Sequence, residues 1–155
     1  MQWKLEDIRM YTQAKEYVDT IMIPMLPATL QVKDEQLATM TIQSEMLSVF
    51  MNEIEKQFKG RILLSPSYTY SPNANVDCEI DRLNRWIEEA EAQGIEHVLL
   101  FTTDPKWKKK ERKLNGSLVW IPAGDIDSIQ SEEAQVFIQS QINQIIELIT
   151  AYWQE

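Results

Sequence analysis

Four short apolar runs, separated by amphipathic or polar segments, constrain the fold of this chain more than any other feature. The runs are residues 21–27, 61–65, 97–101 and 117–121. They are rich in Ile, Leu, Val and Phe without polar alternation, which is typical of strands buried on both faces of a sheet. Elsewhere apolar residues recur at three- and four-residue steps, which predicts helices at 6–18, 34–59, 77–93 and 131–152.

The order of these elements predicts how the strands run. Helices connect the first three strands, and such right-handed crossovers join parallel strands. The fourth strand follows segment 104–116, whose final Asn115-Gly116 is a strong turn signal, so we expect it to be antiparallel. Pro24 has no N–H, so the first strand should end near it or lie at a sheet edge there. The predicted fold is a three-layer α/β domain in which helices flank a mixed four-stranded sheet, with three parallel strands and one antiparallel strand.

The length and composition fit one folded domain spanning residues 1–155. The chain has 44% hydrophobic and 25% charged residues, which is typical of a globular domain. No apolar run approaches the roughly 18–20 residues that span a bilayer, and the residues after Met1 do not resemble a secretory signal. The single cysteine, Cys78, cannot form an intrachain disulfide, which fits a reducing compartment. We therefore expect a soluble cytoplasmic protein.

Hydroxyl and carboxyl side chains gather where the three parallel strands are predicted to end. In open α/β sheets, ligands bind outside the carboxyl ends of the strands, and these side chains can hydrogen-bond a small polar ligand. The alternative is that they satisfy backbone donors in local turns. The candidate ligand-binding residues are Ser65, Ser67, Tyr68, Tyr70, Thr102, Thr103 and Asp104.

The motifs of the common catalytic and cofactor-binding classes are missing from the chain. The four glycines are too far apart for a GxGxxG or Walker A loop, and there is no GxSxG elbow. His97 lies near the amino end of its strand, away from the candidate ligand residues, so we expect a structural role for it. Cys78 lies at a helix start between two acidic residues, and we expect it to pack against its neighbours. We predict no catalytic residue and no cofactor.

Two groups of acidic residues have a spacing that offers oxygen ligands to Mg²⁺ or Ca²⁺. One group is Asp125 and Asp127, and the other is Asp77, Glu79 and Asp81. A turn at 124–127 and the start of a helix explain these acids better. We therefore predict no metal site.

The most unusual feature is a basic segment within an acidic chain. Residues 106–113 hold six basic residues and one acidic residue, a net charge of +5 in a chain of −9, so the remainder carries −14. Cations this close repel one another, which costs stability unless an anion offsets it. As the tip of a hairpin loop, the segment either is simply solvated or binds an anionic partner. The candidate partner-binding residues are Lys106, Trp107, Lys108, Lys109, Lys110, Arg112 and Lys113.

An acidic protein, or a second copy of this chain, is the favoured partner of the basic segment. Trp107 is suited to stack on a nucleic acid base or to insert into anionic lipid, but the net charge repels nucleic acid at long range. The leading hypothesis is a non-catalytic interaction module whose basic hairpin loop engages an anionic partner. The alternative is a small-ligand or nucleotide-binding protein with its site at the carboxyl ends of the parallel strands. The sequence does not decide whether that alternative is an enzyme.

Three stretches of the chain resemble a known family. They are Trp3–Ile8, Ala14–Thr20 running into Ile23-Pro24, and Trp120-Ile121-Pro122. In these stretches and in overall likeness, the chain is similar to the YpiF-like family, a domain-of-unknown-function family from spore-forming bacilli. The resemblance implies a bacterial, intracellular, single-domain protein. It implies no activity and assigns no functional residue.

Overall fold

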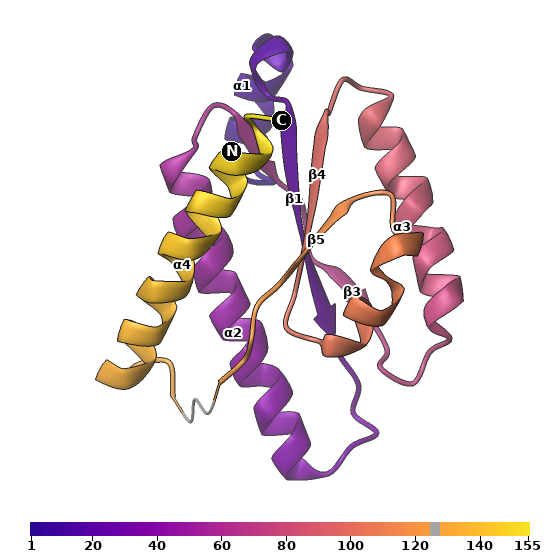
Figure 1. The fold of residues 1–155 in the computed structure, drawn as a ribbon, viewed down its shortest axis with the longest axis vertical. Helices are drawn as coiled ribbons and strands as arrows, with labels where there is room; N and C mark the ends of the chain where they lie inside the picture. Colours follow the sequence, from indigo (N-terminus) through magenta and orange to yellow (C-terminus); the bar gives the residue numbers. More distant parts are fainter. Residues whose placement is uncertain (125–127) are drawn as a thin grey trace.

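A computed structural model describes residues 1–124 and 128–155, so the turn predicted at 124–127 lies mostly outside the described residues. The α-helices are α1 (Leu5–Gln13), α2 (Asp34–Gln57), α3 (Val76–Glu91) and α4 (Glu132–Tyr152). Two 3₁₀ helices are η1 (Lys15–Tyr17) and η2 (Pro105–Lys113). The strands are β1 (Thr20–Pro27), β2 (Ile62–Leu64), β3 (Tyr68–Tyr70), β4 (His97–Thr102) and β5 (Ser117–Trp120). The three-layer α/β prediction is confirmed, with five strands in place of four (Figure 1).

The predicted antiparallel direction of the fourth strand is wrong. The strand order is β2-β1-β4-β5, with β3 also paired to β1, and every pairing is parallel. β5 runs beside β4 in the register Leu100↔Leu118, so the basic segment between them is not a hairpin loop. It winds into η2, whose nine residues cover roughly 18 Å at about 2 Å per residue. That distance matches a strand of about five residues, so the chain returns to the amino edge of the sheet before β5 begins.

Strand β1 continues through Pro24, contrary to the expectation that it would end there. The first half of β1 pairs with β2 and its second half, from Met25, pairs with β3. The carbonyl of Met22 accepts a hydrogen bond from the N–H of Ser65. Alternate residues of β1, counted from Met22, therefore direct their backbone groups toward β2 and β3. Pro24 is in that set and lies where β1 changes partner. Its missing N–H therefore removes no ladder hydrogen bond.

Alternating side chains of the central strands fill two separate hydrophobic layers. Ile21, Ile23 and Met25 contact the layer formed with α3, whereas Met22 contacts the layer formed with α2 and α4. Strand β4 alternates in the same way, since Leu100 and Leu99 belong to opposite layers. In Figure 1, α2 and α4 lie on one side of the sheet and α3 on the other. Burial on both faces explains why the strands show no polar alternation.

The helices cover the sheet without any membrane-spanning feature. Among the described residues, every helix is too short or too polar to cross a bilayer. The predicted helix ends agree with the structure at two places. Ser131 Oγ accepts from the N–H of Ala134 at 3.1 Å and caps α4, and Gly60 follows α2 with a φ of 102°, a conformation that favours glycine.

Candidate functional site

All seven predicted ligand-binding residues lie at the carboxyl edge of the sheet, because every strand is parallel. They do not form one open site. Ser65 and Ser67 lie in the connection between β2 and β3, and the two tyrosines lie in β3 itself. Thr102 ends β4, and Thr103 and Asp104 follow it. The sequence placed residues 66–75 in a loop, but three of them form the short fifth strand.

Tyr70 and Asp104 bond to one another and seat η2 on the sheet. The Tyr70 hydroxyl donates to Asp104 Oδ2 at 2.7 Å, and Asp104 Oδ1 accepts from the N–H of Lys106 at 3.0 Å, which caps the first turn of η2. Burial and the hydrogen bond to Asp104 raise the pKa of Tyr70 well above its ordinary value. The Tyr70 ring meets the Trp107 ring edge to face, with centroids 5.2 Å apart. These contacts hold η2 against β3.

Thr102 and Thr103 are also engaged within the protein. Both side chains are buried. Thr102 Oγ1 accepts from the N–H of Asp104 at 3.0 Å, and Thr103 Oγ1 donates to Gln43 Oε1 of α2 at 3.3 Å. Neither hydroxyl is presented to a ligand.

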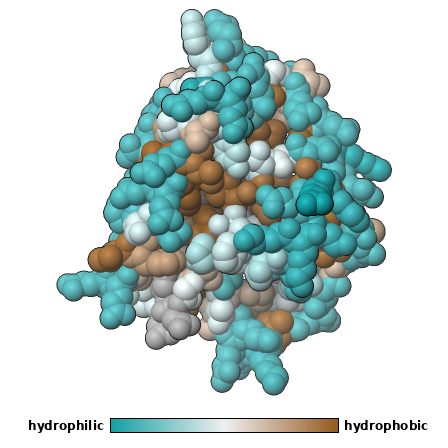
Figure 2. Space-filling model, in the orientation of Figure 1, coloured by the Kyte–Doolittle hydropathy of each residue, from teal (hydrophilic) through white to brown (hydrophobic). Residues whose placement is uncertain are grey.

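The basic helix η2 buries its aromatic residue and exposes its cations. Trp107 is 1% exposed, so it is not available to stack on a base or insert into lipid. Lys106, Lys108, Lys109, Arg112 and Lys113 are exposed and Lys110 is half-buried. Figure 2 shows hydrophilic surface over the part of the molecule where η2 lies in Figure 1. The segment is therefore a helix that buries Trp107 and presents cations on its surface.

Part of the positive charge of η2 is balanced by helix α3. Nζ of Lys110 and Nζ of Lys113 each lie 3.4 Å from Asp77 Oδ1. The hydrogen bond from Lys113, followed by the charge of Lys110, lowers the pKa of Asp77. Lys108 Nζ lies 4.4 Å from the centroid of the Trp120 ring. Within residues 1–124 and 128–155, Lys106, Lys109 and Arg112 make no ion pair.

Ser65, Ser67 and Tyr68 line a cavity of about 270 Å³ between α3 and the β2–β3 connection. Trp3, Arg82 and Trp86 line it with them. The Tyr68 hydroxyl donates to the Glu79 carboxylate, and burial together with that hydrogen bond raises the pKa of Tyr68 above its ordinary value. This cavity is where part of the predicted ligand set meets residues that the sequence analysis did not select.

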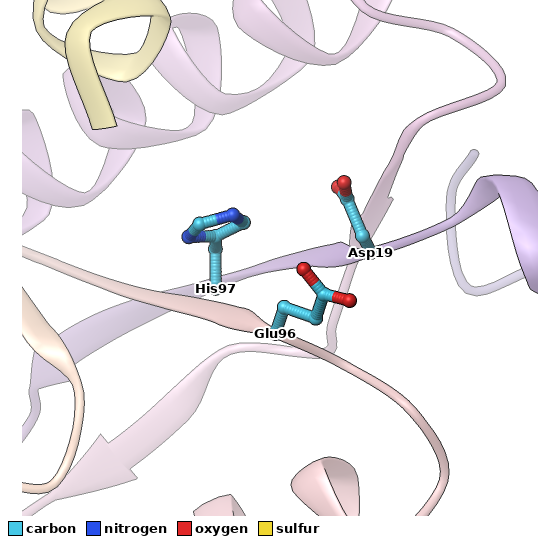
Figure 3. Close-up of side chains that lie close together, drawn as sticks. All are labelled: Asp19, Glu96 and His97. Atoms are coloured by element: carbon cyan, nitrogen blue, oxygen red, sulfur yellow. The ribbon is translucent and has the colours of Figure 1, made fainter. Parts of the chain in front are cut away.

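A second cluster lies at the opposite, amino edge of the sheet and was not predicted. Within the described residues, Asp19, Glu96 and His97 bring potential metal-ligating atoms within 4.8 Å of one another (Figure 3). The Asp19 carboxylate is already bound by Arg61, whose Nε and Nη2 donate to it at 3.0 and 2.9 Å. The Arg61 guanidinium in turn lies 3.8 Å from the Trp153 ring centroid. Both oxygens of one of the three potential ligands therefore already bind a cation, and Asp19 and Arg61 form an ion pair of the fold.

Partial burial raises the pKa of Asp19, but hydrogen bonds from Arg61 and Thr20 lower it by more, so the pKa lies below its ordinary value. The hydroxyl of Thr20 donates to Asp19 Oδ1 at 2.7 Å and accepts from the Trp153 indole N–H at 2.8 Å. The start of β1 is thereby tied to the end of α4. His97 lies beside this network at the first residue of β4, as expected of a structural histidine.

The remaining candidates of the sequence analysis differ in their surroundings. Asp77 pairs with two lysines of η2 and Glu79 with Tyr68 and Arg82, whereas Asp81 is exposed. Asp125 and Asp127 lie outside the described residues. Cys78 is exposed, so the expectation that it packs against neighbours is wrong.

The comparisons with known proteins identify a family whose function is unknown. Residues 9–153 match the model of a family described as "Protein of unknown function (DUF2487)". The chain belongs to this family. It is 24% identical over 153 residues to the "Uncharacterized protein YpiF" of Bacillus subtilis (strain 168), a match covering 99% of this chain and 98% of that protein. No solved structure matches it.

Membership of this family confirms the resemblance drawn from the sequence, including its extent over the whole chain. The family description carries no activity and no residue roles, so the function has to be argued from the geometry.

Two of the cavity residues that the sequence analysis did not select, Arg82 and Trp86, have a spacing that indicates a shared position. Arg82 and Trp86 are one helical turn apart, so they share a face of α3 next to Leu83. A basic and an aromatic residue on the same face as the buried stripe mark the border between core and solvent. The contribution of Trp3 depends on tertiary packing alone, and nothing in its neighbourhood indicates it.

Proposed function

We propose that this protein is a non-catalytic binding module that contacts an acidic partner protein through the basic helix η2. The observation that carries the proposal is the seating of η2. Buried Trp107 and capping Asp104 fix the helix, while four of its six cations make no ion pair within residues 1–124 and 128–155. Three of these four, Lys106, Lys109 and Arg112, also lack the ring contact that Lys108 makes. A preformed surface loses little conformational entropy on binding, which favours affinity.

The burial of Trp107 supports a protein partner over nucleic acid or lipid. Binding to single-stranded nucleic acid relies on aromatic stacking, and interfacial binding to lipid relies on inserted apolar side chains. The one aromatic residue of η2 serves neither purpose. The charge of −14 outside residues 106–113 also repels extended polyanions. A compact acidic patch on another protein avoids that repulsion, because it contacts η2 alone.

The acidic partner is either a different protein or a second copy of this chain, since the remainder of the chain is itself acidic. We place the protein in the cytoplasm. The exposed free thiol of Cys78 is compatible with a reducing compartment.

Binding of a fluorescent polyglutamate peptide tests the role of η2. The triple variant Lys106→Gln, Lys109→Gln and Arg112→Gln should weaken binding about tenfold, if each cation contributes roughly 0.5 kcal/mol. The matched control is Lys4→Gln, Lys59→Gln and Arg85→Gln, which removes the same charge from exposed sites elsewhere. Raising the salt concentration should weaken binding to the wild type but change the triple variant little.

Equal loss of binding in the two triple variants would show that net charge alone, and not η2, attracts the peptide. Sedimentation of the wild type at low salt separates the two kinds of partner. Self-association that the η2 variant abolishes identifies a second copy, whereas a monomer leaves a different acidic protein as the partner.

A further inference from the structure

A cavity on the α3 side of the sheet has no role in the binding of an acidic protein. Its floor is formed by Ile23 of β1 and Leu83 of α3, both fully buried. Its walls come from α3, from the connection between β2 and β3, and from Trp3 near the amino terminus. It shares no lining residue with η2. Any ligand here is therefore independent of the proposal above.

Three aromatic rings from distant parts of the chain converge on this cavity. They belong to Trp3, Tyr68 and Trp86. The Trp3 side chain is 58% exposed. Leaving the apolar surface of an indole in water is unfavourable compared with burying it. The Tyr68 ring packs against Tyr70 and Arg82. Aromatic groups stack favourably at 4.5–7 Å between centroids, so rings that line one hollow suit a planar ligand. The walls therefore favour a planar aromatic molecule.

The charge lining the cavity is positive. Arg82 is the charged residue in its lining, and its side chain is 66% exposed. Its guanidinium lies 4.9 Å from the Tyr68 ring centroid and its Nη1 lies 3.7 Å from Glu79 Oε2. That ion pair is long, and the Glu79 carboxylate also accepts the Tyr68 hydroxyl. The guanidinium has five N–H donors, so it retains donors for a carboxylate or phosphate.

Two serine hydroxyls add neutral hydrogen-bonding groups at the carboxyl end of β2. Ser65 is buried, and its Oγ donates a hydrogen bond to the carbonyl of Pro66 at 2.8 Å. The Ser65 Oγ can still accept a hydrogen bond through its lone pairs. Ser67 is exposed at the mouth. The volume of about 270 Å³ is slightly below the range of ligand pockets, which begins at about 300 Å³. It suits a ligand that inserts one ring or two fused rings.

We propose that this cavity binds a small molecule that has a planar aromatic ring system and one anionic group, with the ring system against Trp3, Tyr68 and Trp86 and the anion on Arg82. A carboxylate and a phosphate share this chemistry. An aromatic carboxylic acid and a purine nucleoside monophosphate are thus the two sources to distinguish.

Nuclear magnetic resonance of the full chain tests the proposal, since each tryptophan contributes one indole N–H signal. The probes are indole-3-carboxylate and guanosine 5′-monophosphate, with indole and guanosine as their neutral counterparts. Variants Trp3→Phe and Trp86→Phe assign the two signals. We expect one anionic probe to shift both signals at millimolar concentration or below, and its neutral counterpart to bind more weakly. The probe that binds identifies the source of the anion.

Variant Arg82→Gln should weaken the anionic probe about tenfold, the effect of losing one charge-assisted hydrogen-bond partner. Arg85→Gln is the matched control, because Arg85 is exposed on the same helix and does not line the cavity. An unchanged Trp107 indole signal verifies that each variant is folded. The proposal is overturned if no probe shifts the Trp3 and Trp86 signals, if neutral and anionic probes bind equally, or if Arg82→Gln binds like the wild type.

Discussion

The two edges of the sheet treat positive charge in opposite ways. At the amino edge, the single guanidinium of Arg61 is held by two hydrogen bonds to Asp19 and by the ring of Trp153. Helix η2, which starts at the carboxyl edge, has six cations, and within the described residues only two of them pair with a carboxylate, that of Asp77. In the first arrangement a cation joins elements of the fold. In the second, cations remain without an ion pair among the described residues.

The presence of a partner inside the fold separates structural cations from cations that are free to bind another molecule. A cation that a carboxylate and an aromatic ring hold within the fold contributes to stability, and its removal leaves the carboxylate unpaired. A cation held on a fixed helix without a partner contributes little to stability. On this criterion Arg61 is structural, and Lys106, Lys109 and Arg112 are candidates for binding.

The largest effect should come from removing the residue that seats η2. Trp107→Ala empties a fully buried site and should lower the free energy of unfolding by about 3–5 kcal/mol. Urea denaturation measures it. Trp120→Ala is the control, because Trp120 is 36% exposed and its loss should cost about 1 kcal/mol or less. Equal losses would mean that Trp107 does not anchor the helix.

A smaller effect is expected at the amino edge. Arg61→Gln removes the two-pronged bond to Asp19 and the stacking on Trp153, and should cost about 1–2 kcal/mol. Lys109→Gln in η2 should change stability by less than about 0.5 kcal/mol. Thermal or urea unfolding of both variants compares the two edges directly. A cost at Lys109 that matches the cost at Arg61 would remove the distinction between them.

The pH dependence of stability should report the same ion pair. The pKa of Asp19 is lower in the folded protein than its ordinary value of 3.8, so the folded state favours the carboxylate. Its contribution is therefore complete above that ordinary value and is lost as the pH falls through the lowered folded pKa. Urea unfolding at several pH values, in wild type and Arg61→Gln, isolates the contribution. The two proteins should converge in stability at the acidic end; parallel curves would contradict the assignment.

The smallest effect concerns the unpaired cations themselves. The triple variant Lys106→Gln, Lys109→Gln and Arg112→Gln should unfold within about 0.5 kcal/mol of the wild type, or be slightly more stable, because like charges are removed. Its binding phenotype then cannot come from misfolding. A large loss of stability would instead place these side chains in the structural class.

The strands and helices could be predicted because their signals are local. Continuous apolar runs identify strands buried on both faces, and Gly60 and Gly94 mark the ends of α2 and α3 with positive φ. The direction of β5 could not be predicted in this way. Asn115-Gly116 is a valid turn signal, but a turn does not reveal whether the nine residues before it form a hairpin arm or a helix crossing the sheet edge.

The candidate site was predictable in location but not in detail. Parallel strands bring Ser65, Tyr70 and Asp104 to one edge, as the pattern indicated. Which hydroxyls stay available depends on partners far along the chain, such as Tyr70 and Asp104, 34 residues apart. Trp107 illustrates the same limit. The residues on either side of Trp107 in the sequence are charged, whereas the ring that it packs against, Tyr70, belongs to strand β3.

If Trp107 anchors η2, the backbone of this helix is as rigid as the strands beside it, and ¹⁵N relaxation of the backbone amides measures that rigidity. We expect order parameters of about 0.85 for residues 106–113, equal to those of β4 and β5. We also expect the Trp107 indole N–H to exchange slowly with water. Order parameters below about 0.6, together with a rapidly exchanging indole, would show that residues 106–113 form a flexible loop without an anchor.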